Sequence, residues 1–187
     1  MTAAPFDPML SVFPCATDAD TVLDLPLSAI IDRIRSPELA KATARIAADF
    51  AAAGGGKAGK LAIDAPKKRL PAVTLAGAFY RRANAAWRDP SGLVQIDIDN
   101  LSTAELVETC AVLTACPWVA CLWSSPSGRG LKGAVRVPVL TVPDPIRYTE
   151  AWRAVTRWLA SIGLVNDPAA KDSARLSYLA HDPAATC

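Results

Sequence analysis

Hydrophobic and polar positions along the chain predict alternating helices and strands after an irregular start rich in Pro and Asp. Residues 28–50 contain helix formers throughout, and Ser36-Pro37 has the form of an N-cap and first position that begin a second helix. Runs rich in Val, Ile and aromatic residues predict strands, which we expect at residues 72–75, 93–98, 118–123, 132–139 and about 175–180.

Two later segments predict helices with defined ends. Ser102 with Glu105 three residues later forms a capping box, so a helix directly follows the strand at 93–98. The last long helix begins near Asp144-Pro145 and ends at Gly163. Apolar residues spaced by three and four are expected to form its buried face: Trp152, Val155, Leu159 and Ile162.

This order of elements, with a hairpin joining the strands at 118–123 and 132–139, predicts an α/β (α+β) fold whose helices pack on a mixed or antiparallel sheet. At 187 residues and 51% hydrophobic content the chain can bury one substantial core, so we expect a single domain, 1–187. The sequence AAAGGGKAGK indicates a flexible segment at about 51–66. A signal sequence and long apolar stretches are lacking, which predicts a cytoplasmic protein with no membrane association.

Charge and cysteine content narrow the function classes. The net charge is only +2, so any nucleic-acid partner must be recognised by local sites rather than by a global basic field. Five cysteines without a CxxC pair, and the single His181, argue against a structural zinc site and predict reduced, mostly buried thiols. The tryptophans suit core packing better than base stacking; these are Trp118, Trp123, Trp152 and Trp158.

The sequence QIDID places two carboxylates on one strand. Because strand side chains alternate, Asp97 and Asp99 project from the same face, ~7 Å apart at their roots. Hard carboxylates at a strand end suit Mg²⁺ or Mn²⁺, and two such ions would activate a 3′-hydroxyl and stabilise a leaving pyrophosphate. The same D-x-D pattern also fits aspartates that cap the next helix or lie on a solvated face.

Two other segments contain residues suited to such a site. The sequence SSPSGRGLK offers small residues whose backbone N–H groups can approach a phosphate, with Arg129 and Lys132 adding charge, although it equally fits an ordinary hairpin turn. Nearer the C-terminus, Asp167 and Asp172 precede a strand that carries Arg175, so a third carboxylate and a cation can join the site.

A third segment has the spacing of a phosphate-binding loop. The run from Gly54 to Lys60 matches G-x-x-x-x-G-K, but Leu61 stands where Ser or Thr would hold Mg²⁺, and a helix rather than a strand precedes the run. We therefore reject a phosphate-binding loop there.

Four ordered segments resemble the primase-like N-terminal domain found ahead of virulence-associated-protein-E-type helicases. They are LPAVTLAGAFYRR, SGLVQIDIDNL, SPSGRGLK and KDSARLSYLAHDP, and the resemblance spans about residues 10–183. That domain belongs to the archaeo-eukaryotic primase (prim-pol) superfamily, whose members place an hhhDhD strand, a small-residue hairpin usually ending in His, and a later acidic residue around one site. The resemblance implies a primase-like catalytic core in which helices pack on an RRM-like unit.

The resemblance also implies roles for particular residues. Asp97, Asp99 and Asp172 would be catalytic and bind Mg²⁺ or Mn²⁺, with Asp167 as the competitor for the third position. The residues expected to bind the nucleotide are Ser125, Ser127, Gly128, Arg129, Lys132, Arg175 and Arg81. Because the hairpin has Lys132 in place of the superfamily's His, either this lysine substitutes for it or catalysis is impaired.

The function implied is metal-dependent, template-directed nucleotidyl transfer in phage, plasmid or mobile-element replication. Its partners would be nucleoside triphosphates, a single-stranded DNA template and a replicative helicase, the last on a C-terminal region beyond residue 187 or on another protein. Two alternatives are a non-catalytic module that binds nucleotides or single-stranded DNA, and a metal-dependent nuclease in which water replaces the primer hydroxyl.

Overall fold

The computed structural model describes residues 6–187, and its central element is a three-stranded antiparallel sheet in the order β6-β8-β7. Strand β6 (Leu93–Asp99) is followed by helix α5 (Thr103–Thr114) and then by the hairpin of β7 (Val119–Ser124) and β8 (Gly130–Arg136). Both outer strands are antiparallel to β8, so β6 and β7 run in the same direction. Helix α5 therefore joins them in a split β-α-β unit.

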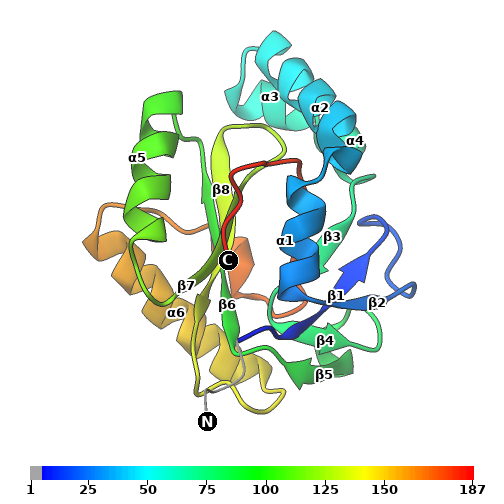
Figure 1. The fold of residues 1–187 in the computed structure, drawn as a ribbon, viewed down its shortest axis with the longest axis vertical. Helices are drawn as coiled ribbons and strands as arrows, with labels where there is room; N and C mark the ends of the chain where they lie inside the picture. The colour runs from blue at the N-terminus through cyan, green and yellow to red at the C-terminus, as the bar shows by residue number, and fades with distance from the viewer. Residues whose placement is uncertain (1–5) are drawn as a thin grey trace.

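The two faces of the central sheet differ in chemistry. Helices α5 and α6 (Pro145–Ser161) cover one face, where Val94, Ile96 and Ile98 of β6 belong to a core that also contains side chains of both helices (Figure 1). Because side chains alternate along a strand, the intervening positions of β6, Asp97 among them, point to the opposite face. That face looks toward the rest of the molecule rather than toward solvent, since Asp97 is buried.

A second antiparallel sheet, in the order β2-β1-β3-β9, lies on this opposite side. Its strands are β1 (Met9–Phe13), β2 (Leu23–Pro26), β3 (Ala72–Thr74) and β9 (Leu176–Tyr178), and a separate hairpin consists of β4 (Gly77–Phe79) and β5 (Trp87–Pro90). Helix α1 (Leu27–Arg35) buries Ile30, Ile31 and Ile34 in a core that contains residues of both sheets, including Trp123 of β7. Helix α1 thus joins the two sheets.

A small helical layer, residues 37–67, lies near the turn between β7 and β8 (Figure 1). It consists of η1 (Pro37–Leu39), α2 (Ala40–Ala52), α3 (Gly56–Ala62) and α4 (Asp64–Lys67). Its core is formed by Ile46, Phe50, Ile63 and Leu70. We call residues 40–67 the helical cap. Two other 3₁₀ helices, η2 (Asn84–Ala86) and η3 (Pro168–Lys171), occur elsewhere in the described chain.

Helices α3 and α4 occupy most of the range 51–66, where the glycine-rich sequence indicated a flexible segment. Glycine makes the tight connection possible: Gly54, Gly55 and Gly56 all have positive φ, which other residues rarely adopt. Gly59 packs against Phe50, where a Cβ atom would lie 2.6 Å from the aromatic ring. Gly59 therefore serves close packing, whereas the other three glycines allow the connection between α2 and α3.

The expected strands at 72–75, 93–98, 118–123, 132–139 and 175–180 correspond to β3, β6, β7, β8 and β9. The capping box is confirmed, because Ser102 accepts a hydrogen bond from the Glu105 N–H and the Glu105 carboxylate accepts one from the Ser102 N–H. Strands β1 and β2 contradict the expected irregular start. The β4–β5 hairpin was not predicted.

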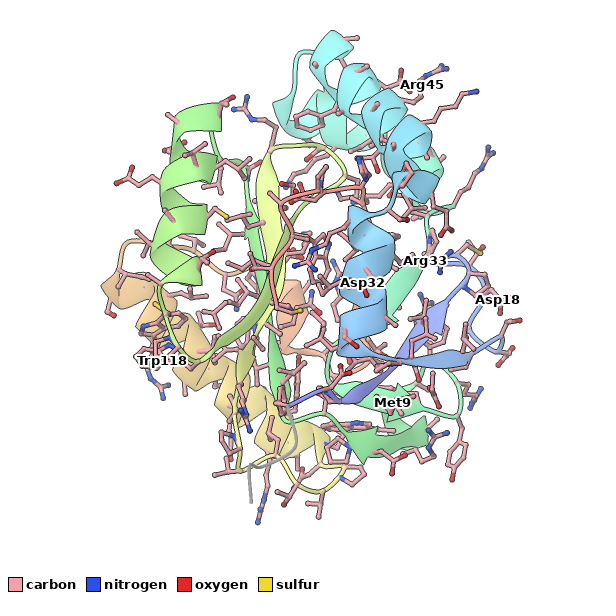
Figure 2. All side chains as sticks on the ribbon, in the orientation of Figure 1. Met9, Asp18, Asp32, Arg33, Arg45 and Trp118 are labelled. Atoms are coloured by element: carbon pink, nitrogen blue, oxygen red, sulfur yellow. The ribbon has the colours of Figure 1, made fainter. Side chains whose placement is uncertain are left out.

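Several burial predictions need correction. Ile162 is 40% exposed because α6 ends at Ser161, and the buried face of the helix instead includes Tyr148. Trp118, at the edge of the molecule in Figure 2, is 48% exposed and contacts Trp158 edge-on. Of the five cysteines only Cys121 is buried. Within residues 6–187, the helices lack the combination of length and apolar character that crossing a membrane requires.

The contribution of the capping box of α5 to stability can be measured directly. Ser102→Ala removes the hydrogen bond to the Glu105 N–H and should lower the free energy of unfolding by about 1 kcal/mol, measured by urea denaturation. Ser161→Ala at the exposed end of α6, where the hydroxyl only donates to the Trp158 carbonyl, is the matched control. Equal effects of the two substitutions would contradict a specific capping contribution.

The cysteines should differ in reactivity in the folded protein. Burial raises the pKa of the Cys121 thiol to about 12, whereas a hydrogen bond with the Thr17 side chain lowers the pKa of Cys15. Iodoacetamide at pH 8 should therefore modify Cys15 quickly and Cys121 only after unfolding, as located by peptide mass mapping. Rapid modification of Cys121 in the native protein would show that β7 is less protected than the structure indicates.

Candidate functional site

Three carboxylates converge beside β6. Asp97 and Asp99 come from that strand, and Asp167 comes from the segment after α6. One carboxylate oxygen from each residue lies within 4.8 Å of the others. The cluster is partly enclosed, since Asp97 is 4% exposed and the other two are half-buried.

Backbone pairing explains how a distant segment reaches β6. The Asp97 N–H donates to the Asn166 side-chain oxygen (2.8 Å), and the Asp167 N–H donates to the Asp97 carbonyl (2.8 Å). The Asn166 amide in turn donates to Thr156 of α6 at 3.3 Å. Asn166 thereby fixes the segment along the free edge of β6, and places the Asp167 carboxylate beside those of the strand.

The cluster corrects the assignment of the third carboxylate. We expected Asp172 there with Asp167 as its competitor, but the structure brings Asp167, not Asp172, to the other two. The two residues flank η3: the Asp167 carboxylate caps its start by accepting from the Ala169 N–H (2.9 Å), whereas Asp172 follows its end. The Asp172 carboxylate accepts from the Ala174 N–H (3.0 Å) and faces a neighbouring groove.

Two lysines neutralise part of this negative charge. Lys132 lies opposite Asp97 in the pairing of β6 with β8, and its ammonium group forms an ion pair with Asp97 and approaches Asp99 at 3.5 Å. Lys60, from α3 of the helical cap, forms a 2.8 Å ion pair with the other oxygen of Asp99. Asp99 is therefore held by cations from two directions, whereas Asp97 is paired with Lys132.

Burial and these cations affect the two strand carboxylates differently. Burial raises the pKa of Asp97, and the nearby charge of Lys132 offsets only part of that effect. Burial also acts to raise the pKa of Asp99, but the charges of Lys132 and Lys60 outweigh it and leave the pKa below its usual value. Asp99 is thus the more readily ionised of the two.

The turn between β7 and β8 approaches the cluster closely. The Ser125 N–H donates to the Gly130 carbonyl (2.8 Å), and the hydroxyls of Ser125 and Ser127 lie 3.1 Å apart. Gly130 faces Asp99 across the strand pair, and a Cβ atom at this glycine would lie 2.4 Å from the Ile98 carbonyl oxygen. A side chain at position 130 would therefore push the turn away from the carboxylates.

A cavity of about 220 Å³ lies between the cluster and the turn. Among the residues expected to bind a nucleotide, Ser125, Ser127, Lys132 and Arg175 line it. The three others lie elsewhere. Gly128 is at the exposed tip of the turn, Arg129 donates to the Leu101 carbonyl (2.6 Å) and lines a different groove, and Arg81 is exposed outside the cavity.

Several residues of the cavity were not anticipated from the sequence. Phe50, Lys60, Ile63 and Lys67 come from the helical cap, and Tyr178 comes from β9. Lys60 belongs to the run that we rejected as a phosphate-binding loop, and the structure supports that rejection because α2 precedes the run and the lysine meets a carboxylate. The spacing of the run carries no signal for the long-range contact with Asp99.

Residues 65–186 match the family described as BT4734-like, N-terminal domain. This segment is more than half of the chain and contains β6, the β7–β8 hairpin, Asp167 and Arg175, whereas α1, α2 and α3 precede it. Neither a curated protein nor a solved structure matches the chain. The extent of the family match establishes that the chain belongs to the BT4734-like family, through its N-terminal domain.

Proposed function

We propose that this domain is a metal-dependent nucleotidyltransferase of the primase-polymerase type, which joins nucleoside triphosphates to a growing strand on a single-stranded DNA template. The observation that carries the proposal is the convergence of Asp97, Asp99 and Asp167 on a cavity whose other walls carry small residues and cations. In cells, the partner would be a replicative helicase that supplies the single strand.

The carboxylate cluster suits a hard divalent cation. Three carboxylate oxygens within 4.8 Å of one another are the donors that Mg²⁺ and Mn²⁺ prefer, and no soft ligand belongs to the cluster among residues 6–187. Bound there, a divalent ion would activate the attacking hydroxyl and neutralise charge on the leaving pyrophosphate. Asp97, Asp99 and Asp167 are the residues that would hold it.

The other cavity residues suit the anionic part of a nucleotide. Lys60, Lys67, Lys132 and Arg175 all line the cavity and can receive the charge of a triphosphate. In the proposed reaction the 3′-oxygen forms a bond to the α-phosphorus, the bond from that phosphorus to the β-phosphate oxygen breaks, and the hydroxyl proton leaves to water. The residues on both sides of the cavity would keep the reacting atoms aligned.

The topology also supports a primase-like core. Strands β6 and β7, joined by α5, form a split β-α-β unit, because β8 lies between them in the sheet. In the chain, β8 and α6 follow β7. The Asn166-Asp167 segment pairs with the free edge of β6, where the fourth strand of an RRM-like unit would lie. The likeness supports the fold that the sequence resemblance implied.

One observation favours a second candidate, a module that binds nucleotides or single strands without turnover. The Lys132 ammonium group already lies between Asp97 and Asp99, so a cation of the protein occupies the position next to both carboxylates. If this lysine remains there in the presence of divalent ions, the domain binds phosphates but performs no transfer.

Nucleotide incorporation tests the leading candidate. Wild-type protein with Mn²⁺ or Mg²⁺ should incorporate labelled nucleoside triphosphates on single-stranded or primed templates. The double variant Asp97→Asn plus Asp99→Asn should lower the incorporation rate by at least ~100-fold. Losing even a residue that only supports a metal ligand costs about 10–100-fold in activity, and these two residues would be ligands themselves. Asp167→Asn should have a similar effect, and Asp172→Asn should not. Folded wild-type protein that binds triphosphate without incorporation would favour the binding module.

Replacing Lys132 tests its competition with the metal. Lys132→Gln removes a positive charge beside three carboxylates, so Mn²⁺ affinity should rise about tenfold, or about 1.4 kcal/mol, as measured by electron paramagnetic resonance. Without metal the variant should melt at a lower temperature than the wild type, because Asp97 is left buried without its cation. Bound Mn²⁺ should return its melting temperature to the wild-type value. Unchanged or weaker Mn²⁺ binding would show that Lys132 does not compete with the ion.

A further inference from the structure

A second groove, of about 460 Å³, continues from the cavity of the carboxylate cluster. The two share Lys67, Arg175, Leu176 and Tyr178, which form the boundary between them. The groove extends from this boundary toward Arg82 and the residues that follow it, away from the carboxylates. Its walls therefore come from α4 of the helical cap, from the segment between β4 and β5, and from the segment that leads into β9.

The groove carries an excess of positive charge. Four cations line it, Lys67, Lys68, Arg82 and Arg175, against two carboxylates, Asp64 and Asp172. The Lys68 ammonium is neutralised by Asp64 at 2.7 Å. Within residues 6–187, none of the other three cations forms an ion pair.

Two of the three unpaired cations, Arg82 and Lys67, are held in place by other means. The Arg82 guanidinium donates to the Ala16 carbonyl (2.7 Å), which fixes the arginine without neutralising it. Lys67 lies over the ring of Tyr178, 5.3 Å from its centroid, and burial together with the charge of Lys132 lowers the pKa of this lysine. Lys67 and Arg82 are thus partly buried cations without carboxylate partners in the described chain, and an anion bound in the groove would stabilise them.

An aromatic ring stands at the boundary with the acidic cavity. Tyr178 lines both spaces and is half-buried in β9, so its position is fixed by the second sheet. Cations that follow a backbone, together with an aromatic side chain for a base, are the elements by which proteins bind single-stranded nucleic acids. A duplex is too wide for a groove of a few hundred cubic ångströms, which is the size of a small-ligand site.

We propose that this groove binds the phosphodiester backbone of a single nucleic-acid strand and leads that strand past Tyr178 to the carboxylate cluster. The inference rests on the proposed function for the identity of the strand as template or primer, but binding itself requires neither metal nor turnover. Arg82 and Arg175 contact backbone phosphates, and Tyr178 supports the base nearest the cluster. The same phosphate chemistry would also suit a free nucleoside triphosphate, which the experiment distinguishes.

Fluorescence anisotropy of a labelled 12-nucleotide single-stranded DNA, in EDTA and without triphosphates, tests the groove. The variant Arg82→Gln plus Arg175→Gln should raise Kd at least tenfold and reduce the slope of log K against log salt by about 1.4, since each backbone contact contributes about 0.7 for a single strand. The control Arg153→Gln plus Arg157→Gln removes the same charge from exposed positions of α6, outside both spaces, and should change Kd less than twofold. Circular dichroism and melting temperature establish that each variant folds.

Three outcomes would overturn the inference: no binding by the folded wild type at low salt, equal weakening in the groove and control variants, or loss of triphosphate binding with DNA binding intact. The variant Asp97→Asn plus Asp99→Asn separates this inference from the proposed function, because it should still bind DNA with wild-type affinity. If the wild type binds DNA through the groove but incorporates no nucleotide, the proposed function fails and the proposal of a DNA-binding groove stands.

Tyr178→Leu should weaken DNA binding more than Tyr178→Phe, which keeps the ring.

Discussion

The ion pair between Asp97 and Lys132 is the interaction on which the arrangement of the site depends. Both residues are buried, and an unpaired charge at either position would cost several kcal/mol. Their pairing requires β6 and β8 to be in a single register, because a shift by one residue would turn one of the two side chains into the apolar core under α5 and α6. The same register places Gly130 opposite Asp99 and brings the turn to the cavity.

The lysines also explain how the domain can hold its carboxylates in place by itself. Many small metal sites exist only when the ion is bound, because their ligands repel one another without it. Here Lys132 and Lys60 hold Asp99 from two sides, and Asn166 fixes the backbone that carries Asp167. A site that is already assembled loses less entropy on binding its ligands, but any incoming cation must displace an ammonium group that is already bound.

The sequence predicted the parts of the fold that local patterns determine. The strand that carries Asp97 and Asp99, the capping box at Ser102 and the hairpin rich in small residues all follow from spacing within a few positions. The choice of Asp167 over Asp172 depends on which end of η3 lies beside β6, which is a tertiary contact with no local signature. Lys60 was missed for the same reason, since its partner Asp99 is far away in the chain and their contact exists only because the helical cap packs beside the turn.

The helical cap is built differently from the rest of the site. It has its own small core, it is joined internally by three glycines with positive φ, and its first two helices lie before the segment that matches the family. The carboxylates and the β7–β8 turn belong to the matched segment, while Phe50, Lys60 and Ile63 of the cap complete the cavity wall. Substitutions in α2 and α3 can thus alter the size and charge of the cavity without changing the strands that position the carboxylates. In the proposed nucleotidyltransferase, these two helices are where substrate preference would change most easily.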